Sequence, residues 1–185
     1  MATDLPDVID SVLGQNVSDN AHLVTGDIQV RELDWVIEPE CWSWADTKSV
    51  SSPSLVKDPP ALLGPPFDLI VTSDTLYIPQ LAQPLLRTIH ALASLSSVGG
   101  KSPLTLLCFE RRDPLLIDHT LNDARKVWGL KPERISHRKL AQAMDKAGLE
   151  WNKEDWDGVE LWKLKLEKPS VGQQVGLDHK PDTVQ

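Results

Sequence analysis

Acidic side chains follow the segments of this sequence that have the pattern of a strand. Asp4, Asp34, Asp74 and Glu110 each come directly after such a segment. Carboxylates can accept hydrogen bonds from ribose hydroxyls or from an exocyclic amine. Trp35, next to Asp34, offers a flat face on which a base can stack. Together these residue types predict a site for a nucleoside-containing cofactor.

Each of these acids also has an ordinary structural role open to it. Asp4 could be a helix N-cap, Asp34 a turn residue, and Asp74 the cap of the helix that follows it. Glu110 could belong to a solvated ion cluster with the two arginines after it. The common position at strand ends favours one shared site, because ligands of open α/β sheets bind outside the carboxyl ends of the strands.

Helices are predicted where apolar residues recur every three to four positions. This spacing occurs in residues 5–20, 78–95, 114–128 and 137–147. Pro6 lies in the first turn of the first segment, where its missing N–H costs little. Ser136 precedes the last segment as a cap, and Gly148 follows it as a helix stop.

Strands are predicted at residues 28–35, 67–74, 104–110 and 159–166. The segments FDLIVTSD (67–74) and LTLLCFE (104–110) are continuously apolar, which is typical of strands buried on both faces. VELWKLKL (159–166) alternates, so we expect an antiparallel strand at the far edge. Strands in alternation with helices predict a doubly wound α/β domain, with a parallel sheet and helices on both faces.

Two segments lack this periodicity. Residues 36–66 are irregular and contain a stretch rich in Ser and Pro, so they are either a lid or a disordered insertion. From Lys168 the chain is polar and aperiodic, and we predict a disordered tail over 168–185. Residues 1–167 are then the single domain.

The composition excludes several classes of protein. A net charge of −8 argues against a general nucleic-acid or anionic-membrane binder and suits a basic protein partner. Cys41 and Cys108 form no C-x-x-C pair and the histidines are scattered, so neither a metal site nor a disulfide framework is predicted. The sequence has no apolar run of membrane-spanning length and no signal-peptide pattern at Met1. We expect a cytoplasmic or nuclear location.

Six motifs occur in a fixed order between residues 2 and 128. They are TDLPDVI, N-V-x-x-N, VRELDW, FDLIVTSDTLY, PLLRTI and FERRDP. In order and spacing they resemble lysine methyltransferase family 16, the seven-β-strand, methyltransferase-21-like enzymes that act on chaperones and translation factors. The resemblance continues by pattern alone to residue 166. It implies a class I, Rossmann-like fold and a protein-lysine N-methyltransferase that uses S-adenosyl-L-methionine as methyl donor.

The resemblance also assigns roles to residues of this sequence. It gives the cofactor site to Asp4, Asp34, Trp35 and Ser73, and the catalytic site to Asp74 and Tyr77. Asp4 would bind the ribose hydroxyls, and Asp34 with Trp35 would contact the adenine. In the D-x-x-Y pair, the carboxylate of Asp74 can hydrogen-bond the acceptor amine, and the ring of Tyr77 can stabilise cationic character on nitrogen and sulfur. Tyr77 could instead be a tyrosine at the edge of the core with its hydroxyl in water.

One part of the family pattern is absent from the sequence. The family's first strand and Gly-rich loop would lie upstream of Met1, and Gly99-Gly100 stands in the reverse order, after a helix and before a strand. In a 3-2-1-4-5 sheet the first strand lies between the second and the fourth. We therefore expect the 67–73 strand to expose an apolar edge and the 5–20 helix to have little to cover. We expect such a truncated chain to be poorly stable and to bind the cofactor weakly or not at all.

Two other functions fit the same sequence. One is a non-catalytic, methyltransferase-like remnant that acts as a protein-binding module. The other is a class I methyltransferase with a small-molecule or nucleic-acid substrate, which the acidic charge disfavours. The coding sequence upstream of Met1 separates the full enzyme from the remnant, because only the former needs a strand and a Gly-rich loop there.

Overall fold

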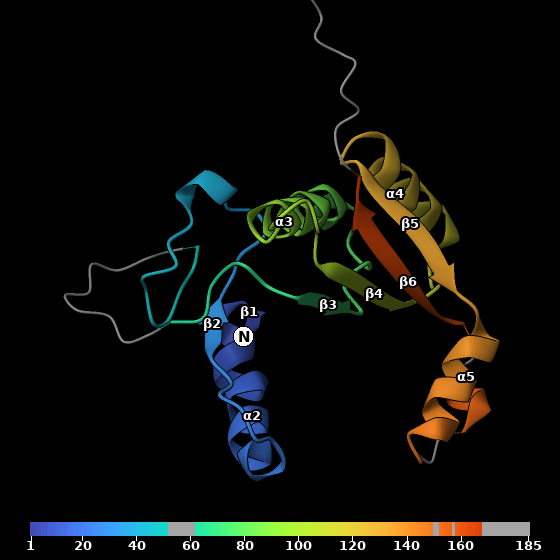
Figure 1. Cartoon of the computed structure of the whole chain (residues 1–185), viewed down its shortest axis with the longest axis horizontal. Coiled ribbons are helices and arrows are strands. Elements are labelled where there is room, and N and C mark those ends of the chain that lie inside the picture. The colour runs from blue at the N-terminus through green and yellow to red at the C-terminus, as the bar shows by residue number, and fades with distance from the viewer. Residues whose placement is uncertain (52–61, 150–151, 157, 168–185) are drawn as a thin grey trace, which may run out of the picture.

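The computed structural model describes residues 1–51, 62–149, 152–156 and 158–167 (Figure 1). These residues form a mixed α/β fold with two separate sheets. In the smaller sheet, β1 (Ala2–Asp4) pairs in parallel with β2 (Val30–Glu32). A helical stretch connects the two strands: α1 (Pro6–Val8), the π-helical η1 (Ile9–Leu13), α2 (Gly14–Asn20) and the 3₁₀ turn η2 (Ala21–Leu23).

The larger sheet has the strand order β3-β4-β6-β5. Its strands are β3 (Leu69–Ser73), β4 (Leu104–Glu110), β5 (Leu130–Ile135) and β6 (Val159–Leu166). β3 and β4 are parallel, and β6 is antiparallel to both of its neighbours. The helices are α3 (Ala82–Leu95), α4 (Pro114–Lys126) and α5 (His137–Lys146), with short 3₁₀ turns η3 (Pro39–Cys41), η4 (Pro79–Leu81) and η5 (Lys153–Trp156).

The main core lies between this sheet and the helices α3 and α4. The odd-numbered residues Leu107 and Phe109 of β4 point to the same face because side chains alternate along a strand. They meet the apolar stripes of both helices, including Ile89 of α3 and Ile117 of α4, in one buried cluster. Asp113 starts α4 by accepting a hydrogen bond from the backbone N–H of Leu116 at 3.1 Å.

The prediction that the 67–74 and 104–110 strands are buried on both faces is wrong. Leu69 and Val71 of β3 are 51% and 61% exposed, and Leu106 and Cys108 of β4 are only partly buried. α3 and α4 share one face of the sheet, so the opposite face keeps contact with solvent. The expectation that the 67–73 strand exposes an apolar edge is confirmed.

The order of the late strands also differs from the prediction. The 159–166 strand is antiparallel, as expected, but it lies between β4 and β5, and β5 is the edge strand. The strand β5, which contains Pro132, was not predicted from the sequence. Proline is tolerated on an edge strand, where one row of backbone groups has no partner strand. The sheet is therefore mixed, and not parallel throughout.

The 5–20 segment is helical, as predicted, but none of its residues is buried. Leu5, Val8 and Val12 of its apolar stripe are all exposed, which confirms the expectation that this helix has little to cover. α5 also agrees with its prediction. Ser136 caps it by accepting from the N–H of Lys139, and Gly148 beyond its end has a positive φ of 67°.

The described parts of the 36–66 segment pack against the smaller sheet and form a second core. Val50 and Leu33 are buried there against Trp44 and Phe67. Arg31 of β2 is buried beneath this segment, and its guanidinium donates to three backbone carbonyls of it, those of Trp44, Asp46 and Leu63. Residues 52–61 and the predicted tail 168–185 lie outside the described residues.

Candidate functional site

The free edges of β1 and β3 face one cavity. Ala2 and Asp4 hydrogen-bond to the β2 side, so the backbone groups of Met1 and Thr3 point the other way, because backbone hydrogen bonding alternates along a strand. Both Met1 and Thr3 line a cavity of about 340 Å³. The outer edge of β2, by contrast, pairs with the segment around Ser49.

β3 forms the opposite wall of this cavity. At its two ends Asp68 and Asp74 hydrogen-bond to β4, so the backbone N–H and C=O groups of Leu69, Val71 and Ser73 point away from β4. All three of these residues line the cavity. A slot with a strand edge on each side therefore separates the two sheets.

Five of the six residues that the sequence suggested as site residues line this single cavity. They are Asp4, Trp35, Ser73, Asp74 and Tyr77. They come from the carboxyl ends of β1, β2 and β3, which meet at the same rim. α3 closes the cavity from one side with Leu85, Thr88, Ile89 and Leu92.

The sixth predicted residue, Asp34, is not among the lining residues. Its carboxylate accepts a hydrogen bond from the N–H of Val36 at 2.9 Å, and its own N–H donates to the hydroxyl of Ser51 at 3.0 Å. This is the turn role that the sequence also allowed for Asp34. In this arrangement it shapes the turn that carries Trp35.

Trp35 is held in place from α3. Arg87 donates from Nη2 to the backbone carbonyls of Trp35 and Val36, each at 2.9 Å, and pairs through Nη1 with the carboxylate of Glu38. The indole ring of Trp35 packs against both hydrophobic clusters. The helix that walls the cavity thus also fixes the aromatic ring at its rim.

Asp74 leaves β3 in a left-handed backbone conformation with φ of 51°. Non-glycine residues rarely adopt this region, although Asp tolerates it better than most. Its exposed carboxylate lies 3.7 Å from Nη2 of Arg112. Arg112 in turn donates from Nε to Glu110 at 2.7 Å. Asp74 therefore presents its carboxylate to the cavity rim with a guanidinium beside it.

Sequence reasoning missed Thr88 of α3. Its hydroxyl is buried, lines the cavity and has no hydrogen-bond partner among the described residues. A buried polar group without a partner costs free energy, so this hydroxyl suits a ligand that can bond to it. The signal in the sequence was a threonine on the apolar face of a predicted helix.

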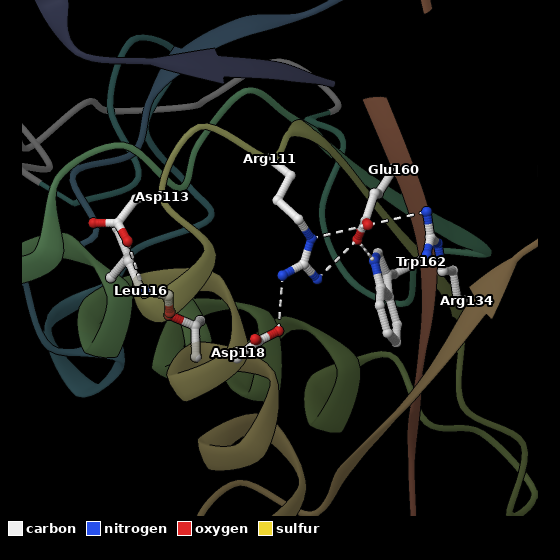
Figure 2. A network of polar contacts seen from close by, with 8 residues as sticks. Arg111, Asp113, Leu116, Asp118, Arg134, Glu160 and Trp162 are labelled. Atoms are coloured by element: carbon white, nitrogen blue, oxygen red, sulfur yellow. Dashed lines mark hydrogen bonds and ion pairs between the residues drawn. The ribbon is translucent and has the colours of Figure 1, made fainter. Parts of the chain in front are cut away.

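Glu110, the fourth acid after a strand, does not line the cavity. Its carboxylate pairs with Arg112, which is the ion-cluster role that the sequence also allowed. Its neighbour Arg111 joins a network of polar contacts around the buried carboxylate of Glu160 (Figure 2). Glu160 of β6 accepts from Arg111 at 2.9 and 3.1 Å, from Arg134 at 3.0 Å and from the indole of Trp162 at 2.9 Å. The network fixes the loop between β4 and α4.

Electrostatics in this network favour the charged forms. Hydrogen bonds to Glu160 and to Asp118 raise the pKa of Arg111. Burial by itself would raise the pKa of Glu160, but the hydrogen bonds from Arg111 and Trp162 and the nearby positive charges outweigh it and lower that pKa. On β4, next to the cavity residue Ser73, burial raises the pKa of the Cys108 thiol, which hydrogen-bonds with Ser73.

The lining residues fit the adenosine part of S-adenosylmethionine. The carboxylate of Asp4, the ring of Trp35 and the hydroxyls of Ser73 and Thr88 supply the acceptors, donor and flat face that a nucleoside needs. No described glycine, lysine or arginine lines the cavity. The cofactor's charged amino-acid end would thus lack both a glycine loop and a cation there.

A scan against models of protein families finds no match for this sequence, and a search among curated proteins finds none either. Among the described residues, no group of three His, Cys, Asp or Glu side chains is placed to hold a metal ion. In the same part of the chain, no helix is both long and apolar enough to cross a membrane.

Proposed function

We propose that this chain belongs to an S-adenosylmethionine-dependent protein-lysine N-methyltransferase. The observation that carries the proposal is the gathering of Asp4, Trp35, Ser73, Asp74 and Tyr77 around one cavity. Their roles follow from the resemblance to lysine methyltransferase family 16, and the residues are up to 73 positions apart in sequence. Ser73, Asp74 and Tyr77 are close in sequence, but Asp4 and Trp35 reach the same cavity from the smaller sheet.

The strand arrangement supports the same proposal. A class I sheet has the order 3-2-1-4-5, and the resemblance equates β1 and β2 with the second and third strands and β3 and β4 with the fourth and fifth. The free edges of β1 and β3 then bound the place of the first strand, and both of these edges face the cavity. The mixed α/β fold is compatible with this order.

The proposed chemistry needs only orientation and charge. When bound, S-adenosylmethionine supplies a methyl group on a positively charged sulfur. Asp4 would accept hydrogen bonds from ribose hydroxyls, and Trp35 would stack on the adenine. Asp74 would accept a hydrogen bond from the substrate amine and hold its lone pair in line with the methyl group. Tyr77, which is exposed beside Asp74, would place an aromatic face near the cationic centre.

Radiolabelled methyl transfer tests this proposal. Cell extract is incubated with labelled cofactor and either this chain or the chain extended by its in-frame upstream coding sequence. Label on lysine is expected with the extended form, and Asp74→Asn should lower it about a hundredfold. Asp27→Asn, at an exposed acid outside the cavity, is the matched control and should change nothing. Label on nucleic acid in place of lysine would contradict the assignment.

The open slot favours a second candidate, a protein-binding module. Strands with unpaired edges bind extended segments of other chains by adding a strand. The N–H and C=O groups of Leu69, Val71 and Ser73 point into the slot from one side and those of Met1 and Thr3 from the other. Co-purification of this chain with a protein partner, without methyl transfer by the extended form, would favour this candidate.

A further inference from the structure

A second hollow, of about 700 Å³, lies at the N-terminal half of α4. Pro79 forms one side, and the others are Asp113, Leu115, Leu116, Asp118, His119 and Asn122. The residues from α4 lie about one turn apart, so they present one continuous face of the helix. The hollow is therefore a groove between the start of α4 and the turn η4.

Large apolar side chains are unusually exposed around this groove. Leu115 is 83% exposed and Tyr77 is 59% exposed, and Ile78 between Tyr77 and Pro79 is also exposed. The side chain of Leu115 at this exposure contributes little to folding. A cluster of exposed apolar residues at a groove is typical of a surface that binds another molecule.

The charge of the groove is negative. Asp113 and Asp118 line it, and it has no lysine or arginine among its described lining residues. Asp118 keeps an exposed carboxylate even though Arg111 donates to it from one side. The whole chain carries a net charge of −8. By charge complementarity, the groove suits a cationic segment with an apolar side chain.

The groove adjoins the cavity through one short segment. Tyr77 lines the cavity and Pro79 lines the groove, so residues 77–79 connect the two hollows. An extended peptide advances about 3.3 Å per residue. We therefore expect a peptide with its lysine side chain at Asp74 to reach the groove with residues a few positions from that lysine.

We propose that this groove binds the part of the substrate protein next to the acceptor lysine. An apolar residue of that segment packs on Leu115 and Pro79, and a basic residue beside it faces Asp113 and Asp118. This inference rests on the proposed function and adds a sequence preference to it. The substrate class is an exposed, basic segment with an apolar residue within four positions of the lysine.

Peptide binding to the full chain tests this preference. The probe is a Gly/Ser peptide with one lysine, one leucine three positions further on and one arginine beside the leucine. Backbone amide shifts are expected to change around Leu115 and His119, and replacing the leucine by serine should weaken binding about tenfold. No binding, or shift changes confined to other surfaces, would overturn the proposal.

Matched variants separate the groove from the rest of α4. Leu115→Gln should weaken the leucine peptide about tenfold, whereas Val127→Gln, at an exposed apolar residue beyond the other end of the helix, should not. Asp113→Asn keeps the helix cap, because Asn caps as well as Asp, and removes one charge. It should weaken only the arginine-containing peptide, about threefold. Equal effects of Leu115→Gln and Val127→Gln would contradict the groove assignment.

Failure of this inference can be distinguished from failure of the proposed function. Methyl transfer to lysine that Leu115→Gln leaves unchanged would reject the groove and keep the proposed function. Peptide binding that depends on Leu115 without any methyl transfer by the extended form would keep the groove and reject the enzyme. Both readouts use the same peptide, so the two failures cannot be confused.

Discussion

Glu160→Gln tests the network around the buried Glu160 carboxylate that fixes the loop between β4 and α4. Glu160 is 4% exposed, and its carboxylate accepts from Arg111, Arg134 and Trp162. Glutamine keeps the shape but loses the charge and turns an NH₂ group toward a guanidinium. Arg111 would keep its bond to Asp118, so the network would be weakened and not abolished.

The magnitude follows from the separate contacts. Hydrogen bonds to a charged group contribute about 1.5–3 kcal/mol net, and the pair with Arg111 makes two of them. Arg134 is 48% exposed, so its pair contributes at most about 1 kcal/mol. We expect Glu160→Gln to lower the free energy of unfolding by about 3 kcal/mol. For a chain of this size that corresponds to a fall in Tm of about 6–12 °C.

The dependence on pH gives the sharper test. The folded protein lowers the pKa of Glu160 below its ordinary value of 4.5. The stability that the carboxylate contributes is thus complete at neutral pH and is lost as the pH falls below about 4.5 through the folded value. Urea unfolding at about pH 7 and about pH 3.5 should show a smaller difference between wild type and variant at the second pH than at the first.

The control is Glu133→Gln on the same sheet. Glu133 is exposed and lies 3.9 Å from Lys165, so its loss should cost less than about 0.5 kcal/mol. A deficit of Glu160→Gln that is as small as that of the control, or that does not shrink in acid, would refute the account of the network.

Three further predictions concern the turn of Trp35, the cavity and the two cysteines. Arg87→Met should remove the two hydrogen bonds that hold the turn of Trp35 and speed amide hydrogen exchange in that turn, while exchange in the centre of α3 stays slow. Unchanged exchange in the turn would show that these hydrogen bonds do not hold it. Thr88→Val replaces a buried hydroxyl that has no partner among the described residues, so urea unfolding should show a gain of about 1 kcal/mol in stability; a loss would mean that the hydroxyl is satisfied. Burial raises the pKa of Cys108, while Cys41 is exposed. Iodoacetamide at neutral pH should therefore alkylate Cys41 first, which peptide mass analysis would show. The reverse order would count against the partial burial of Cys108.

The sequence predicted the helices better than the burial of the strands. The spacing of apolar residues in α3, α4 and α5 depends on local periodicity, which one sequence contains. The apolar run of β3 was interpreted as burial on both faces, but burial depends on which elements lie beside the strand. Leu69 and Val71 stay exposed because α3 and α4 cover only one face of the sheet, and because β3 has a partner strand on one side only among the described residues.

The candidate site shows the same division between local and long-range information. The position of Asp4 and Asp74 at the ends of strands predicted that they share a site, because ligands of α/β sheets bind at the carboxyl ends of the strands. Both residues do line the same cavity. Position could not separate Asp74 from Asp34, whose carboxylate bonds back to its own turn. The contribution of Thr88 depends on how α3 lies over the slot, which no local pattern of the sequence contains.

The free edge of β3 has a consequence for purified material. Every copy of the chain presents the same row of backbone donors and acceptors flanked by Leu69 and Val71. Two copies can pair such identical edges about a twofold axis, which runs the paired strands antiparallel. An extended segment of a partner protein that adds to this sheet needs the same edge. Self-association and the binding of such a partner would therefore compete, and protein concentration sets the balance between them.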